Sequence, residues 1–148
     1  MAQNLRLARL YFVLLALVAI GRWMLSFRVP YQVGTDKMSI VILTIFASVF
    51  YAAFCRRWRG YSLLQAMGLA AMLAFFGQLV ILLSTAASYI LGLETYFNDP
   101  RALNVPAAIP LLEALGRRSV GLASNTILNS IVGMLGWALG ALLPADAK

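Results

Sequence analysis

The sequence predicts an all-α integral membrane protein with four transmembrane helices and a partly helical outer loop between the third and fourth helices. Hydrophobic residues make up 62% of the chain and charged residues only 11%, whereas a soluble domain has about 25% charged residues. The apolar residues also gather in four runs, and a helix needs roughly 20 such residues to cross the hydrocarbon core. Residues 1–148 are therefore expected to form a single four-helix transmembrane domain.

The first span is predicted at about residues 5–27, around the uncharged core Leu10–Gly21. A basic start followed by an apolar core is also typical of a secretory signal peptide. Arg22 and Trp23 stand where a cleavage site of small residues would be expected. We therefore expect a retained first span rather than a cleaved signal.

The other three spans are predicted at about residues 37–55, 62–92 and 119–143. Met38–Cys55 and Ser119–Ala145 contain no charged residue. The run from Gly60 to Leu93 is longer than a bilayer requires, so this span should tilt or project beyond the headgroups.

The segment 93–118 is predicted to be a structured outer loop. Its "NDP" motif places a side-chain acceptor before a proline, and "VPAAIPLLEALG" combines a proline start with a glycine stop. These signals predict two short helices. The second is too short to span, and we expect it to lie on the bilayer surface and cap the bundle.

The orientation depends on where the basic residues lie, since short cytoplasmic loops are rich in Lys and Arg. The twelve Lys and Arg residues divide equally between the two sides of the predicted bundle. The sequence "RRWR" at 56–59, however, places three arginines in the shortest connection, which should be the hardest to translocate. We therefore expect a multi-pass protein of the cell membrane with both termini cytoplasmic.

Small and polar residues form a stripe on the fourth span. Their spacing of 4, 4, 3 and 4 places them on one helical face, and they are Asn125, Asn129, Gly133, Gly136 and Gly140. Small residues let helices approach closely in lipid, so the stripe favours a packing seam. A polar binding pocket that uses the two asparagines is the alternative.

The second and third spans have similar faces, on which Ser48 and Gln78 lie. Each face combines small and polar residues, as the fourth span does. The three faces are expected to meet around a common axis, where Ser48 and Gln78 would take part in helix packing.

Charged residues supply the other candidate binding groups. Arg22 lies inside an apolar run, so it should either extend to the outer headgroups or pair with Glu94, Asp99 or Glu113. The loop adds five candidates for an anionic headgroup or for a partner's loop: Asp99, Arg101, Glu113, Arg117 and Arg118. Carboxylates so close to arginines are more typical of structural ion pairs than of catalytic acids and bases.

Several functions are not expected from this composition. The chain has no histidine and only five carboxylates, so we expect no metal and no cofactor. The net charge of +7 comes from basic residues that flank apolar runs and meet lipid headgroups, so nucleic acid is not an expected partner. No catalytic or nucleotide-binding motif occurs, and an enzyme is not favoured.

The packing devices favour an accessory or scaffold protein that associates with itself or with a larger membrane complex, with membrane lipids as further partners. A carrier or channel for a small solute or lipid, using the Asn125 and Asn129 stripe, is the alternative. A lipid-modifying enzyme acting at the outer loop is a third hypothesis. A polar cavity reaching Asn125 would favour transport, and a dry helix contact would favour packing.

The predicted orientation can be tested by labelling single cysteines in intact cells with a membrane-impermeant thiol reagent. Cysteines placed at Gln3 and Ala147 should be shielded, and one placed at Ala102 should react. Reaction at Gln3 would contradict this topology.

Overall fold

The computed structural model describes residues 2–31 and 38–144, and these residues form helices and turns without any β-strand. Four helices are long and apolar enough to cross a membrane, which indicates a multi-pass membrane protein. The helices in chain order are α1 (Ala2–Leu7), α2 (Arg9–Ser26), α4 (Ile40–Arg59), α5 (Leu63–Ile90), the 3₁₀ helix η1 (Pro100–Leu103) and α6 (Leu111–Leu139).

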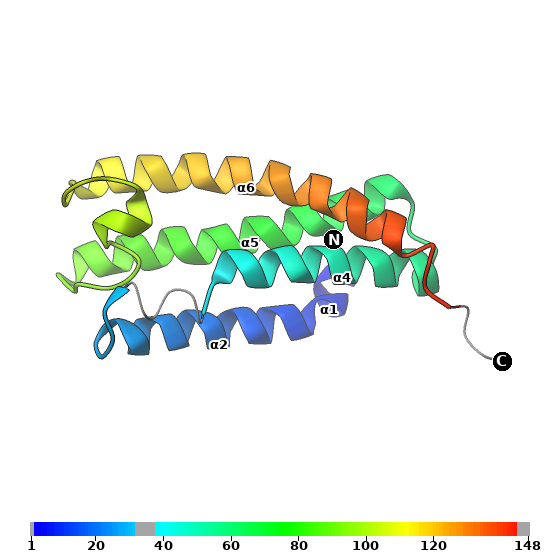
Figure 1. The fold of residues 1–148 in the computed structure, drawn as a ribbon, viewed down its shortest axis with the longest axis horizontal. Coiled ribbons are helices and arrows are strands. Elements are labelled where there is room, and N and C mark those ends of the chain that lie inside the picture. The colour runs from blue at the N-terminus through cyan, green and yellow to red at the C-terminus, as the bar shows by residue number, and fades with distance from the viewer. Residues whose placement is uncertain (1, 32–37, 145–148) are drawn as a thin grey trace.

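The four long helices run alternately up and down along the bundle (Figure 1). One end, which we call the turn end, contains the short connection between α4 and α5. The opposite end, which we call the loop end, contains the segment 91–110 with η1. The beginning of α2 and the end of α6 point toward the turn end, so the connections at the two ends differ in length and character.

The helices α4, α5 and α6 pack most extensively against one another, and α2 has fewer contacts with them. The buried face of α2 presents Tyr11, Leu15 and Ala19, spaced by four residues. The Tyr11 hydroxyl donates to the Leu73 carbonyl at 2.8 Å and lies 3.0 Å from Thr44 Oγ1. A buried tyrosine thus ties α2 to both α4 and α5.

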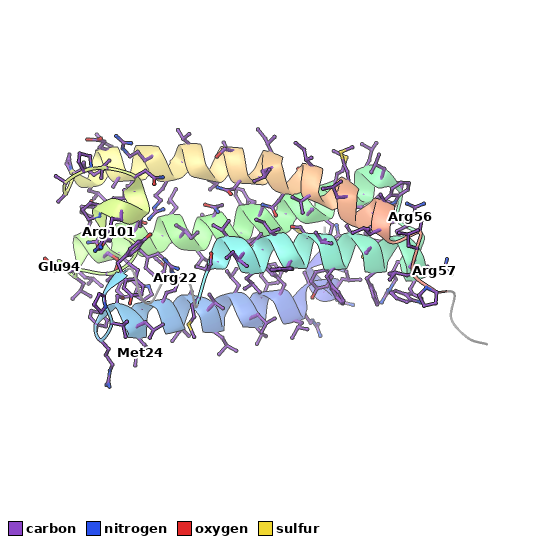
Figure 2. The ribbon with its side chains drawn as sticks, in the orientation of Figure 1. Arg22, Met24, Arg56, Arg57, Glu94 and Arg101 are labelled. Carbon is purple, nitrogen blue, oxygen red and sulfur yellow. The ribbon has the colours of Figure 1, made fainter. Side chains whose placement is uncertain are left out.

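Charged side chains gather at the two ends of the bundle (Figure 2). At the turn end, Arg56 donates to the Trp137 carbonyl at 2.9 Å, and its guanidinium lies 3.7 Å from the Trp137 ring centroid. Arg57 donates to the Pro144 carbonyl at 2.9 Å. Arg56 thus binds a carbonyl at the carboxyl end of α6, where positive charge is favourable, and Arg57 binds the segment that follows this helix.

The prediction for the loop is correct for its first helix and wrong for its second. Pro100–Leu103 form η1, and Asp99 accepts a hydrogen bond from the Arg101 backbone N–H as the N-cap. Residues 111–118, however, are the first turns of α6, so this helix begins before the predicted span 119–143 and no separate surface helix precedes it. Gly116 keeps a helical conformation, because the positive φ angles among the described glycines are at Gly60 and Gly92. A glycine that retains its N–H and a helical φ continues the hydrogen bonding, at a cost of about 1 kcal/mol.

The first predicted span, 5–27, is also divided, since α1 and α2 are separated at Ala8. The predicted second span, 37–55, corresponds to α4, which begins at Ile40 and continues to Arg59. Its N-cap is Ser39, whose hydroxyl accepts a hydrogen bond from the Ile42 N–H.

Two glycines of α6 and its C-cap, Gly140, lie against the neighbouring helices near the turn end. A Cβ atom at Gly133 would lie 2.7 Å from the Ala70 Cβ of α5. A Cβ atom at Gly136 would lie 2.5 Å from the Val49 carbonyl of α4, and one at Gly140 would lie 2.6 Å from the Ala53 carbonyl. These three positions, which we call the glycine seam, therefore accept no larger residue without displacing backbone.

The same helix packs less closely at Gly121, although Ala114 in its first turn is fully buried. A Cβ atom at Gly121 would have its nearest neighbour, Gln78 Oε1, at 4.0 Å. In Figure 1, α6 comes close to α4 near its carboxyl end and separates from it toward its amino end. The bundle is thus closed at the turn end and wider at the loop end.

The glycine seam predicts that Gly136→Ala lowers thermal stability in detergent, because the added methyl group must displace the α4 backbone. Overpacking of this kind costs about 1–3 kcal/mol. Gly116→Ala is the matched control on the same helix, since its methyl group would enter open space. Equal melting temperatures for the two variants would contradict close packing at the seam.

Candidate functional site

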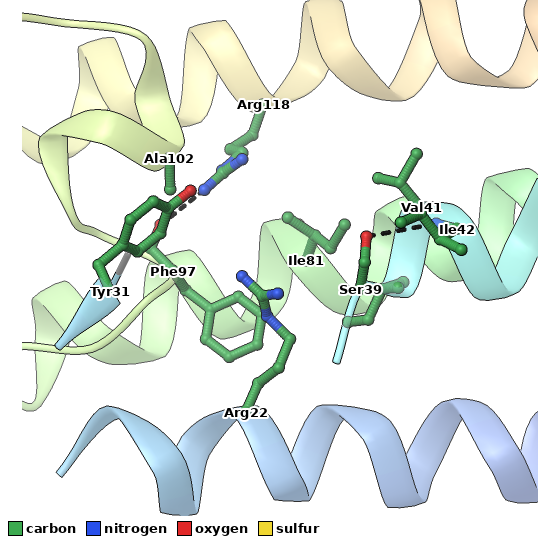
Figure 3. A pocket seen from close by; sticks show the side chains of 10 residues that line it. Arg22, Tyr31, Ser39, Val41, Ile42, Ile81, Phe97, Ala102 and Arg118 are labelled. Carbon is green, nitrogen blue, oxygen red and sulfur yellow. Dashed lines mark hydrogen bonds between the residues drawn. The ribbon is translucent and has the colours of Figure 1, made fainter. Parts of the chain in front are cut away.

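A pocket of about 310 Å³ lies at the loop end, between α2, the start of α4, α5 and α6. The pocket lies where α4 begins. Ile40, the first residue of α4, lines the pocket together with Ile81 of α5. Ile81 is nine residues before the end of α5, or about 14 Å along the helix axis. We call this cavity the arginine pocket, since Arg22 and Arg118 reach it from opposite sides (Figure 3).

Arg22 points into the bundle rather than outward. It follows Ala19 by three residues and so continues the buried face of α2. Its Nη1 donates to the Met38 carbonyl at 2.7 Å, and its guanidinium lies 5.4 Å from the Phe97 ring centroid. Arg22 forms no ion pair with Glu94, Asp99 or Glu113, and its contact with the outer headgroups stays a prediction.

Arg118 reaches the pocket from the second turn of α6. Its Nε donates to Thr85 Oγ1 at 3.1 Å, and its Nη2 donates to the Phe97 carbonyl at 2.8 Å. Thr85 belongs to α5 and is fully buried. Arg118 therefore joins α6 to α5 and to the segment 91–110, and its charge lies next to the pocket.

Arg101 and Arg117 form surface ion pairs instead. Arg101 Nε lies 3.0 Å from Asp99 Oδ1, and Arg117 Nη2 lies 3.1 Å from Glu113 Oε1. The hydrogen bond with Asp99 raises the pKa of the Arg101 guanidinium above its ordinary value. The candidate residues Asp99, Arg101, Glu113 and Arg117 thus compensate one another in pairs.

Arg22 and Arg118 have no carboxylate partner among the described residues, and no described residue that lines the arginine pocket is acidic. Burying a charge without a partner costs several kcal/mol. The first turn of the 20-residue helix α4 also lines the pocket, from Ser39 to Ile42. A helix start carries partial positive charge and free N–H groups, so the pocket is electrostatically suited to an anion.

A second cavity of about 510 Å³ adjoins the first and shares Val41, Ile81, Ala102 and Arg118 with it. We call it the amide pocket, because Gln78 and Asn125 both line it. Gln78 is only 7% exposed, and its carboxamide forms no hydrogen bond with the described residues. It lies at the wall of this cavity, opposite Gly121 of α6.

The polar stripe of α6 divides between this cavity and a dry contact. Asn125 lines the amide pocket and donates through Nδ2 to the Gly121 carbonyl at 2.9 Å. One turn later, Asn129 is 1% exposed and its Oδ1 accepts a hydrogen bond from the Ser48 hydroxyl at 2.9 Å. Asn125 thus lines a cavity, whereas Asn129 lies in a dry contact between helices.

Two parts of the site carry no signal in the sequence. The Phe97 carbonyl that binds Arg118 is a backbone group, and nothing in the side-chain pattern around Phe97 points to it. The start of α4 lines the site because this helix begins at Ile40, whereas the sequence predicts a start at about residue 37. Within the part of the chain that the structure describes, no group of three or more His, Cys, Asp and Glu side chains could hold a metal ion.

Comparison of this chain with protein-family models, with curated proteins and with solved structures finds no match.

The contacts of Arg118 predict that Arg118→Met increases amide hydrogen exchange in residues 95–103, because the segment loses its bond at the Phe97 carbonyl. A hydrogen bond to a charged group contributes about 1.5–3 kcal/mol, so exchange should be roughly tenfold faster or more. Arg117→Met removes the neighbouring charge but only a surface pair, and should change exchange little. Similar exchange in the two variants would contradict the anchoring role of Arg118.

Proposed function

We propose that this protein is a multi-pass membrane protein that binds a phosphate-bearing anionic lipid headgroup in the arginine pocket. The observation that supports the proposal is the convergence of Arg22 and Arg118 on a cavity with no acidic side chain among its described lining residues. A guanidinium is a planar fork of donors that matches phosphate oxygens and remains charged when partly buried. An anion would supply the missing counter-charge.

The position of the pocket along the helices is consistent with a headgroup. Arg22 is four residues before the end of α2, about 6 Å from that end. Lipid phosphates lie just outside the hydrocarbon core, where arginine side chains meet them. With both termini in the cytoplasm of the cell, as proposed from the arginines at 56–59, the loop end would face outward and the ligand would come from the outer leaflet.

The close packing of the helices near the turn end supports ligand binding rather than a continuous channel. The Ser48–Asn129 hydrogen bond and the glycine seam follow the amide pocket directly along α6. A path through the bundle would have to separate helices whose backbones are in contact. The polar cavity that reaches Asn125 therefore supports a lipid-binding or lipid-carrying role more than solute conduction.

An accessory role in a larger membrane complex is a second proposal. It is supported by an apolar groove of about 210 Å³ between α2 and α4, lined by Leu10, Leu14, Phe46 and Phe50 among others. The glycine seam does not support self-association, since its glycines contact α4 and α5 of the same chain. The groove is the surface that a neighbouring membrane helix would use.

Lipid binding can be tested by native mass spectrometry with phosphatidylpropanol, an anionic phosphodiester lipid, and with zwitterionic phosphatidylcholine as the reference. Arg22→Gln and Arg118→Gln should each weaken phosphatidylpropanol binding by about tenfold or more, since each removes a charge-assisted hydrogen bond. Arg101→Gln is the matched control, because it removes an equal charge at the loop end from a residue that lines neither pocket. Equal effects of all three substitutions would contradict the proposed site.

Asp36 lies outside the described residues and is tested separately as an internal counter-charge. If the pocket is open to a ligand, Asp36→Asn should leave phosphatidylpropanol binding nearly unchanged. A tenfold rise in affinity in this variant would show that a carboxylate of the chain already occupies the site, and it would contradict the proposal.

A further inference from the structure

We propose that the amide pocket recognises hydroxyl groups, so that the preferred ligand is a phosphate esterified to a polyol or a sugar. This inference rests on the proposed function, since it assumes that the phosphate lies between Arg22 and Arg118. It adds the class of headgroup that the site selects.

The shared wall of the two pockets suggests how one ligand would occupy both. Arg118 lines the arginine pocket and the amide pocket alike. A phosphate bound to its guanidinium would therefore direct its ester substituent into the amide pocket. The volume of about 510 Å³ falls in the range typical of small-molecule sites and leaves room for a glycerol, inositol or hexose unit.

Gln78 is the residue that indicates a polar substituent. The whole residue is only 7% exposed, and its carboxamide has no hydrogen-bonding partner among the described residues. No fully buried side-chain N or O atom of the described residues lacks a partner, so the carboxamide of Gln78 is accessible from the cavity and open to a polar group of a ligand. A hydroxyl-bearing ligand supplies one, since a hydroxyl group both donates and accepts and thus suits a carboxamide.

The α6 wall of the amide pocket leaves Gln78 accessible. Gly121 of α6 has no side chain there, and a Cβ atom at this position would lie 4.0 Å from Gln78 Oε1. Asn125 lies one turn farther along α6, and its Oδ1 accepts no hydrogen bond from the described residues. Two carboxamides, one from α5 and one from α6, therefore present unused hydrogen-bonding groups to the same cavity.

The charges of the amide pocket argue against an amine-bearing headgroup. Arg117 and Arg118 line the cavity, and none of its described lining residues is acidic. Arg117 is paired with Glu113, but an ethanolamine or choline group would place a cation beside Arg118, and like charges repel. A neutral polyol has no such penalty and can use both carboxamides.

The test compares phosphatidylglycerol with phosphatidylpropanol by native mass spectrometry of the full chain, because the two lipids differ only in the two headgroup hydroxyls. The wild-type protein should prefer phosphatidylglycerol by about tenfold or more, since sites that bind a hydroxyl discriminate strongly against the analogue without it. Gln78→Leu should lower this ratio toward one while phosphatidylpropanol binding stays unchanged. Asn125→Leu provides the same comparison from the other wall if Gln78→Leu does not fold.

The possible failures can be told apart. Equal binding of the two lipids by the wild-type protein, or an unchanged preference in both leucine variants, would contradict hydroxyl recognition and leave the phosphate site intact. If the Arg118 substitution weakens the binding of neither lipid, this result would instead contradict the proposed function.

A competition experiment distinguishes a lipid headgroup from a soluble ligand of the same chemistry. Soluble sn-glycerol 3-phosphate and propyl phosphate are added as competitors of bound phosphatidylglycerol. Competition by glycerol 3-phosphate at concentrations equal to the lipid would assign a soluble ligand with the same chemistry, whereas competition only in large excess would assign the lipid. Stronger competition by propyl phosphate than by glycerol 3-phosphate would contradict the inference.

Discussion

The close contact of α6 with α4 and α5 through Gly133, Gly136 and Gly140 is the constraint on which the rest of the structure depends. In lipid, helices gain no hydrophobic energy by associating, so association depends on contact between backbones and on a few hydrogen bonds. The seam brings three helices together at the turn end. From there α6 separates from α4 toward the loop end, where the cavities lie.

The segment 91–110 closes this wider end and is itself held by polar bonds. Tyr96 donates to the Val29 carbonyl just beyond α2, and Arg118 donates to the Phe97 carbonyl. Arg118 thus holds this segment and also brings positive charge to the arginine pocket. A bundle without a ligand would keep two partly buried cations at one cavity, where like charges repel. Binding of an anion would relieve that repulsion and strengthen the attachment of the segment.

The helices could be predicted from the sequence because hydropathy and length directly reflect the requirements of the bilayer, and the residues of the seam from their spacing on one helical face. The prediction of a second loop helix was wrong because a glycine stop depends on backbone conformation, and Gly116 stays helical. The inward direction of Arg22 was implicit in the spacing of Tyr11, Leu15 and Ala19. Its meeting with Arg118 was not, since two residues so far apart in sequence converge only through tertiary packing and the late start of α4.

The central claim, that Arg22 and Arg118 together hold a phosphate, is tested most directly by solid-state NMR in vesicles of an anionic phospholipid. Dipolar dephasing between lipid ³¹P and arginine side-chain ¹⁵N would be measured for the wild-type chain, for an Arg22→Gln/Arg118→Gln double variant, and for Arg101→Gln. The account predicts strong dephasing in the wild-type protein that is lost in the double variant and retained in Arg101→Gln. Dephasing of equal size in all three proteins would place the phosphates at surface arginines and contradict the account.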